Sequence, residues 1–133
     1  MSAVPRWITS SAVLLLHEES IATFGGARGI RDEGLLDSAL ARPRNAYGYR
    51  PEVSIAKLAA SYAFGLAKNH AFVDGNKRAA FLSIGVFLAI NGFALNAEQP
   101  DAIRTMLAVA NGELGEDVLA SWIQENVVPA EAL

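Results

Sequence analysis

The stretch "HAFVDGNKR" at residues 70–78 gathers most of the side chains in this chain that could do chemistry. His70 is of the residue type that most often takes a proton from a hydroxyl group near neutral pH. Asp74 supplies the kind of carboxylate that holds Mg²⁺ together with phosphate oxygens and water. Lys77 and Arg78 add two positive charges directly afterwards. A base, a metal ligand and cations so close together are what phosphoryl or nucleotidyl transfer requires, because that chemistry depends on positioning and on charge stabilisation.

Apolar spacing on both sides places this stretch between two helices. Residues 54–69 carry an apolar face at helical period, and residues 79–90 are apolar on nearly every side, which predicts a helix buried in the middle of a bundle. If that second helix begins near Asn76 or Lys77, its unpaired amides and its dipole form an anion site. Gly75 permits a positive φ or a close approach to a ligand, and asparagine is a preferred N-cap.

The remaining sequence predicts four more helices. One covers about 9–24 and ends at a pair of glycines, and a second covers about 32–42 and stops at Pro43. Residues 43–52 lack a helical period and predict an exposed loop. The segments "QPDAIRTMLAVANG" and "GEDVLASWIQENV" predict the fifth and sixth helices, whereas "FALN" could be briefly extended. The expected fold is all-α, a bundle of about six helices around a buried central helix.

Composition limits the classes of protein that this chain can belong to. Its 133 residues are 52% hydrophobic and 19% charged, which predicts a single domain over 1–133. A net charge of −3 disfavours a direct nucleic-acid partner, and the absence of cysteine excludes disulfides and thiolate metal sites. The longest apolar run, 79–90, is shorter than the roughly 20 residues of a membrane span. We expect a cytoplasmic protein without a membrane partner.

Structural roles compete with the chemical ones at each position. His70 could cap the end of the preceding helix, Asp74 could be a loop acceptor, and Asn76 could be a structural N-cap. Phe72 is predicted to be a buried core residue that anchors the loop. His17, on the apolar face of the first helix, is predicted to be a structural histidine and not a ligand of a metal or cofactor.

The stretch at 70–78 resembles the signature of the Fic/Doc family, in particular its Doc (death-on-curing) branch. "LLLHEESIATFGGARGIRDEGLLDSALARP" is similar to the N-terminal region of Doc-type toxins, so the likeness covers about 10–95. Family members that transfer AMP carry the pattern HPFxDGNGRxxR. This chain departs from it at Ala71, Lys77 and Phe81, which replace a proline, a glycine and an arginine. The "NKR" form is the one that Doc toxins have.

The resemblance implies a Fic/Doc fold and a protein kinase that moves the terminal phosphate of ATP to a hydroxyl of elongation factor Tu, stopping translation. His70 would be the general base and Asp74 the Mg²⁺ ligand. The groups that would hold the phosphates are Asn76, Lys77 and Arg78, with the backbone at Gly75 and with Lys68 as a further basic residue. Residues 44–52 correspond to the region where Fic proteins align their targets.

The resemblance also implies a partner. Family members are usually encoded with an antitoxin, Phd-like in the Doc branch, whose segment fills a groove beside the active site. We expect restraint of the activity to come from this separate protein.

Three other functions stay open at this point. AMP or another nucleotidyl transfer is disfavoured by Lys77 and Phe81, because the pattern loses a flexible glycine and a bidentate phosphate ligand. A non-catalytic binding module would use the same loop merely to cap a buried helix. A metal nuclease is the least favoured, given the acidic balance and the single usable histidine.

Overall fold

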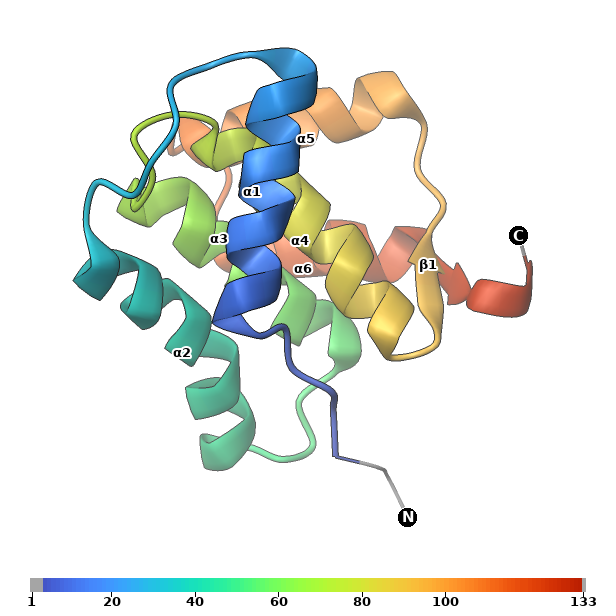
Figure 1. The fold of residues 1–133 in the computed structure, drawn as a ribbon. Helices are drawn as coiled ribbons and strands as arrows, with labels where there is room; N and C mark the ends of the chain where they lie inside the picture. Colours follow the sequence, from blue (N-terminus) through green and yellow to red (C-terminus); the bar gives the residue numbers. More distant parts are fainter. Residues whose placement is uncertain (1–3, 133) are drawn as a thin grey trace.

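The structure, a computed structural model, describes residues 4–132 and has six α-helices with one small antiparallel sheet (Figure 1). The elements in chain order are α1 Ser10–Phe24, α2 Glu33–Tyr49, α3 Ile55–Asn69, α4 Asn76–Ile90, β1 Phe93–Leu95, α5 Gln99–Ala110, α6 Glu116–Asn126, β2 Val127–Pro129 and a short 3₁₀ helix Ala130–Ala132. The expected all-α architecture is confirmed.

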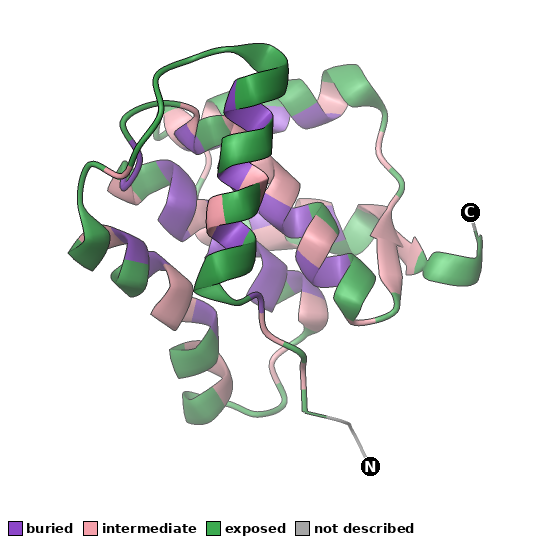
Figure 2. Cartoon of the chain, in the orientation of Figure 1, coloured by how far each residue is buried: buried purple, intermediate pink, exposed green. Residues whose placement is uncertain are grey.

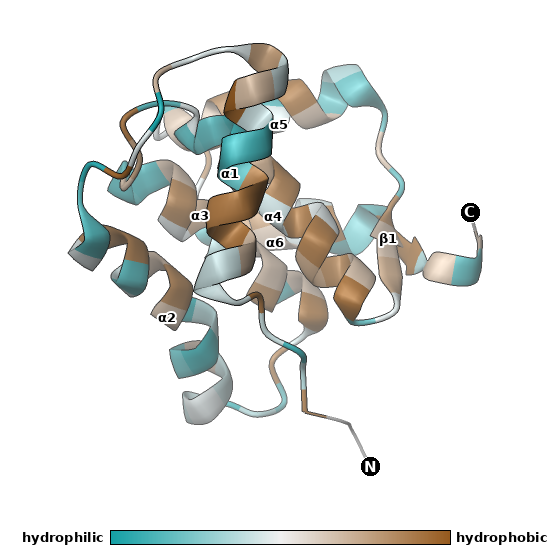
Figure 3. Ribbon diagram, viewed as in Figure 1, coloured by the Kyte–Doolittle hydropathy of each residue, from teal (hydrophilic) through white to brown (hydrophobic). Residues whose placement is uncertain are grey.

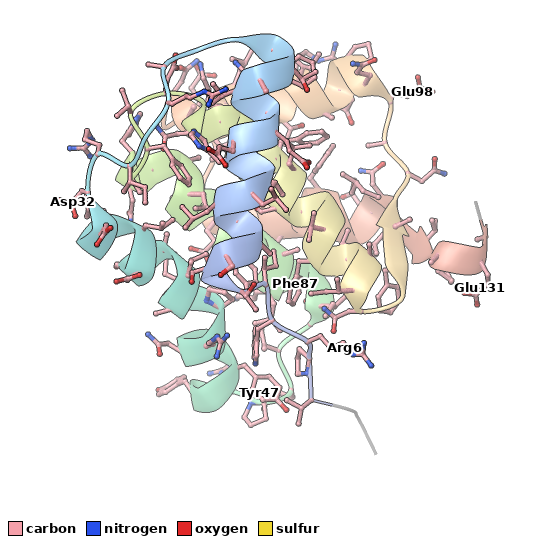
Figure 4. All side chains as sticks on the ribbon, in the orientation of Figure 1. Arg6, Asp32, Tyr47, Phe87, Glu98 and Glu131 are labelled. Atoms are coloured by element: carbon pink, nitrogen blue, oxygen red, sulfur yellow. The ribbon has the colours of Figure 1, made fainter. Side chains whose placement is uncertain are left out.

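Three of the helices begin where a short polar side chain can satisfy a free amide. Thr9 accepts a hydrogen bond from the amide of Ala12, and Ser54 accepts one from the amide of Lys57, both at 3.1 Å. Asp32, labelled in Figure 4, accepts one from the amide of Leu35 at 2.9 Å. These bonds satisfy donors that the first turn of a helix leaves unpaired, so local sequence sets the starts of α1, α2 and α3.

The core is centred on α3, which packs against α2, α4 and α6. Ten of its fifteen residues are buried, against seven of fifteen in α4 (Figure 2). The expectation that residues 79–90 lie in the middle of the bundle therefore holds for one face of α4 only. Its other face remains hydrophobic in composition but is partly open, with Gly85 exposed and Phe81 and Leu82 half-buried (Figure 3).

Helix α2 corrects the prediction that Pro43 ends the second helix. The helix continues through Pro43 to Tyr49, so the predicted loop is wrong over 43–49. An internal proline costs about 3 kcal/mol because it removes a hydrogen bond and crowds the preceding turn. Packing offsets this cost: Pro43 is buried, and the ring of Tyr47 packs edge-on against Trp7 with centroids 5.7 Å apart. Trp7 also stacks on Phe87, which ties the N-terminal segment to α4 (Figure 4).

The extended segment expected at "FALN" is present as β1, and its partner lies at the other end of the chain. Phe93 pairs with Pro129 and Leu95 with Val127, in antiparallel register. This pairing holds the C-terminal segment beside the end of α4, as Figure 1 shows. Among the described residues, no helix is long and apolar enough to cross a membrane.

Candidate active site

The loop between α3 and α4 is held in place by the segment that follows α1. The amide of Val73 donates to the carbonyl of Gly29 at 3.0 Å, and the amides of Arg31 and Asp32 donate to the carbonyl of Ala71 at 2.7 and 3.0 Å. Ile30 and Phe72 form an isolated antiparallel bridge. The two segments therefore form a short ladder, and the backbone of the loop is fixed along most of its length.

Phe72 and Asn76 close the loop from inside. Phe72 is 1% exposed, as expected of a core anchor. The Asn76 side chain accepts from the amide of Phe72 and donates to its carbonyl, both at 3.0 Å. The N-cap of α4 is Gly75, with φ +76°, so the prediction that Asn76 caps the helix is wrong. Because Gly75 has no side chain, the first amides of α4 have no capping acceptor and are available to bind an anion.

His70 ends α3 in an unusual backbone conformation. Its φ of 51° and ψ of 48° are left-handed, and it is the only residue other than glycine with a positive φ in the part of the chain described. Such a conformation costs about 1–3 kcal/mol unless its surroundings enforce it. The guanidinium of Arg31 donates to the carbonyl of His70 at 2.7 Å and to that of Asn69 at 3.2 Å. Arg31 thus performs the capping role considered for His70, which is exposed and lines the cavity described below.

The carboxylate of Asp74 is oriented by two backbone amides. Oδ2 accepts from the amide of Ala27 at 3.1 Å and Oδ1 accepts from that of Gly75 at 2.8 Å. These bonds, the Ala27 bond first, lower the pKa of Asp74 below its ordinary value, and the positive charge of Arg78 acts in the same direction. The side chain is exposed and is held ionised at neutral pH, as a ligand for a hard cation must be.

The cations differ in their surroundings. Lys77 is exposed and lines the cavity. Arg78 also lines it, but its Nη1 donates to the carbonyls of Ser20 and Gly25, each at 3.2 Å, so its guanidinium also holds the end of α1. Lys68 is not brought to the site: its ammonium lies beside Gly112, between α5 and α6, and is not part of the cavity lining.

A cavity of about 660 Å³ lies over the loop and the start of α4. Its polar wall contains His70, Asp74, Gly75, Asn76, Lys77 and Arg78. Its apolar wall contains Phe24, Val73, Phe81 and Leu82 together with Ala102, Ile103, Met106 and Leu107 of α5; Gln99 also lines it. A volume in this range, with a few convergent polar groups, is typical of sites for small organic ligands.

The donor set fits Mg²⁺ only as a metal shared with a ligand. No group of three or more His, Cys, Asp or Glu side chains that could hold a metal exists within residues 4–132. Mg²⁺ usually binds one or two carboxylates and completes its shell with phosphate oxygens and water. Asp74 beside the open N-terminus of α4 matches that arrangement, because the helix end can hold the same phosphates.

Sequence reasoning missed the residues that support this loop. His17 was read correctly as structural, but its contact with the carbonyl of Asp74 was not foreseen. Ser20 and Arg31 were given no role, and Gly26 was expected only to end the first helix. The cluster "GGARGIR" was the available signal, since three glycines and two arginines in seven residues are more than a helix stop requires.

A comparison with protein-family models decides the relationship. The model described as Fic/DOC family matches residues 7–88, which is more than half of the chain. This chain belongs to the Fic/Doc family. The family membership and the fold inferred from "HAFVDGNKR" are therefore confirmed. The matched range covers α1 to α3 and all of α4 except its last two residues, and these helices build the loop and its support.

Two curated relatives are of the Doc type. The chain is 47% identical over 85 residues to "Toxin Doc" of Mycolicibacterium smegmatis, a match that covers 63% of this chain and 65%, less than two thirds, of that protein. It is 27% identical over 126 residues to "Protein kinase doc" of Escherichia phage P1, covering 95% of this chain and 99% of that protein. At a coarse level, the family and these names support a toxin-related transferase.

Proposed function

We propose that this Fic/Doc protein is a Doc-like toxin that transfers the γ-phosphate of ATP to a hydroxyl of elongation factor Tu. The observation that carries the proposal is a single cavity whose lining includes His70, Asp74 and the uncapped start of α4. The name of the phage relative, a protein kinase, supports phosphoryl transfer. Inhibition of translation in the cytoplasm follows from the proposed target.

Each part of the cavity has a role in this reaction. The first amides of α4 and the ammonium of Lys77 would hold the terminal phosphates, and Asp74 would bind a Mg²⁺ ion. That ion, when bound, would neutralise charge on the transferred group. His70 would accept the proton as the target hydroxyl attacks the γ-phosphorus and ADP leaves. The amide side chain of Asn76 stabilises the loop, so its contribution to phosphate binding would come from its backbone.

The residues near the helix start favour this reaction over AMP transfer. Lys77 stands where AMP-transferring relatives have a glycine. Phe81 lines the cavity where those relatives place a phosphate-binding arginine. An aromatic ring cannot make the bidentate bonds of a guanidinium. The cavity wall is therefore short of one cation that nucleotidyl transfer would use.

A Phd-like antitoxin is the partner that we propose, and an apolar groove supports it. A second cavity of about 440 Å³ shares Phe81 and Leu82 with the first and continues along the open face of α4 towards β1. Its lining is almost entirely apolar, so an amphipathic segment bound there would reach the edge of the active site. Loss of binding of a Phd-like peptide in a Gly85→Glu variant, measured by calorimetry, would support this location.

Labelled ATP tests the reaction directly. Purified protein is incubated with elongation factor Tu and with ATP labelled at either the α- or the γ-phosphate. Movement of the γ label alone supports the kinase, movement of the α label identifies nucleotidyl transfer, and movement of neither contradicts both. His70→Asn is the control, because asparagine tolerates the left-handed backbone at this position while removing the base.

A further inference from the structure

His17 is a buried histidine that has no part in the proposed chemistry and yet contacts the active-site loop. It lies on α1, is 3% exposed, and its Nε2 is 2.7 Å from the main-chain carbonyl oxygen of Asp74, 57 residues away. A carbonyl oxygen can only accept, so Nε2 must carry the hydrogen. The tautomer of His17 is therefore fixed by the loop, and the carbonyl of Asp74 is fixed by His17.

The bond acts on a peptide group that has a second role. The Asp74–Gly75 peptide is planar, so holding its carbonyl oxygen also sets the direction of its N–H on the opposite edge. That N–H, on Gly75, is one of the two amides that bind the Asp74 carboxylate, at 2.8 Å from Oδ1. Gly75 is also the N-cap of α4. One hydrogen bond from α1 thus orients both the carboxylate and the anion-binding helix end.

Packing around His17 leaves this peptide little room to move. The imidazole stacks on Phe72 with centroids 3.7 Å apart and an interplanar angle of 6°. A Cβ on Gly75 would lie 3.0 Å from Cδ1 of Ile21 and 3.5 Å from Nε2 of His17. The side chains of α1 therefore lie directly against the Asp74–Gly75 peptide. The hydrogen bond from His17 then fixes the orientation of this peptide about the chain.

We propose that His17 is a positioning residue, which sets the Asp74–Gly75 peptide for MgATP binding. This inference rests on the proposed phosphotransfer, but its structural part can be measured without it. A buried histidine that merely fills space would be replaceable by any apolar side chain of similar size. A positioning histidine requires a hydrogen-bond donor at the place of Nε2.

Three variants separate these roles. His17→Phe keeps a ring against Phe72 and removes the donor, whereas His17→Gln offers an amide N–H at a similar reach. Val13→Ala is the matched control, because Val13 is fully buried one turn earlier on the same helix and does not line the cavity. Thermal unfolding of each variant measures how much stability it loses.

The first measurement is the rate of γ-phosphate transfer. We expect His17→Phe to lose about 100-fold in kcat/KM for MgATP, as small displacements of reacting groups do, with the KM for the protein target unchanged. His17→Gln should regain most of that loss. Equal losses in His17→Phe and in an equally destabilised Val13→Ala would overturn the proposal.

The second measurement is amide hydrogen exchange, which needs no activity. His17→Phe should speed exchange at residues 73–78 selectively, and His17→Gln should restore protection, whereas Val13→Ala should raise exchange only in step with its global stability. If the parent protein transfers no phosphate, the proposed function fails, but this exchange pattern still decides the role of His17. Unchanged exchange at residues 73–78 in His17→Phe would overturn the proposed positioning role of His17.

Discussion

Gly26 offers a direct test of how the Asp74 carboxylate is positioned. In the Gly26→Ala variant the new Cβ would lie 2.7 Å from Oδ2 of Asp74 and 3.0 Å from Cδ1 of Ile21. A contact of 2.7 Å cannot be tolerated, so the exposed carboxylate must move away and lose its bond from the amide of Ala27. Gly26 also has a φ of +120°, which an alanine adopts only at a cost of about 1–3 kcal/mol in the free energy of unfolding.

Gly25→Ala separates the two effects. Gly25 is also in a positive-φ conformation, at +87°, but a Cβ there would meet no atom within 4 Å. Both variants should therefore lose stability by a similar amount in urea unfolding, whereas only Gly26→Ala should disturb the carboxylate. Removing a group that orients a metal ligand weakens metal binding by about 10–100-fold.

The assay measures the rate of γ-phosphate transfer against Mg²⁺ concentration and gives the concentration at which transfer is half-maximal. We expect that concentration to rise by about tenfold or more in Gly26→Ala and to stay near the parental value in Gly25→Ala. Equal Mg²⁺ dependence in the two variants would refute the reasoning, because the carboxylate would then be free of the contact or unconnected with the metal.

Three further predictions concern the loop itself. His70→Asn should lower kcat by about 10²–10⁴-fold while leaving MgATP affinity in calorimetry unchanged; transfer at the parental rate would exclude His70 as the base. Asp74 has a lowered pKa in the folded state, so its contribution to stability is present above its ordinary pKa of 3.8 and is lost as the pH falls through the folded value. In Asp74→Asn, stability should therefore fall less steeply as the pH drops below about pH 4, as followed by circular dichroism. An unchanged dependence of stability on pH would contradict the assigned bonds. Lys77→Gly should lose phosphate transfer, and the double variant with Phe81→Arg should gain traces of AMP transfer by mass spectrometry of the target; full phosphorylation by Lys77→Gly would make Lys77 a solvated cation.

Local features of the sequence were sufficient to predict most of the secondary structure. Thr9, Asp32 and Ser54 cap the helices that they were expected to begin, because a cap depends only on residues three positions apart. The position of His70 at the end of α3 was predicted for the same reason, from the length of an apolar period. The motif itself identified the family, since its side chains lie within one short segment.

Contacts between distant segments decided the rest. The α2 helix continues past Pro43 because Tyr47 packs on Trp7, forty residues earlier in the chain, and no local signal includes that partner. Asp74 accepts a hydrogen bond from the amide of Ala27, which lies 47 residues away in the sequence. Arg31 donates a hydrogen bond to the carbonyl of His70, which lies 39 residues away. The sequence by itself determined which residues are candidates for the proposed chemistry, because residue type and short spacing are local. Their orientation depended on the tertiary structure, because the hydrogen bonds that hold Asp74 and His70 form only when α1 and the segment after it pack against the loop.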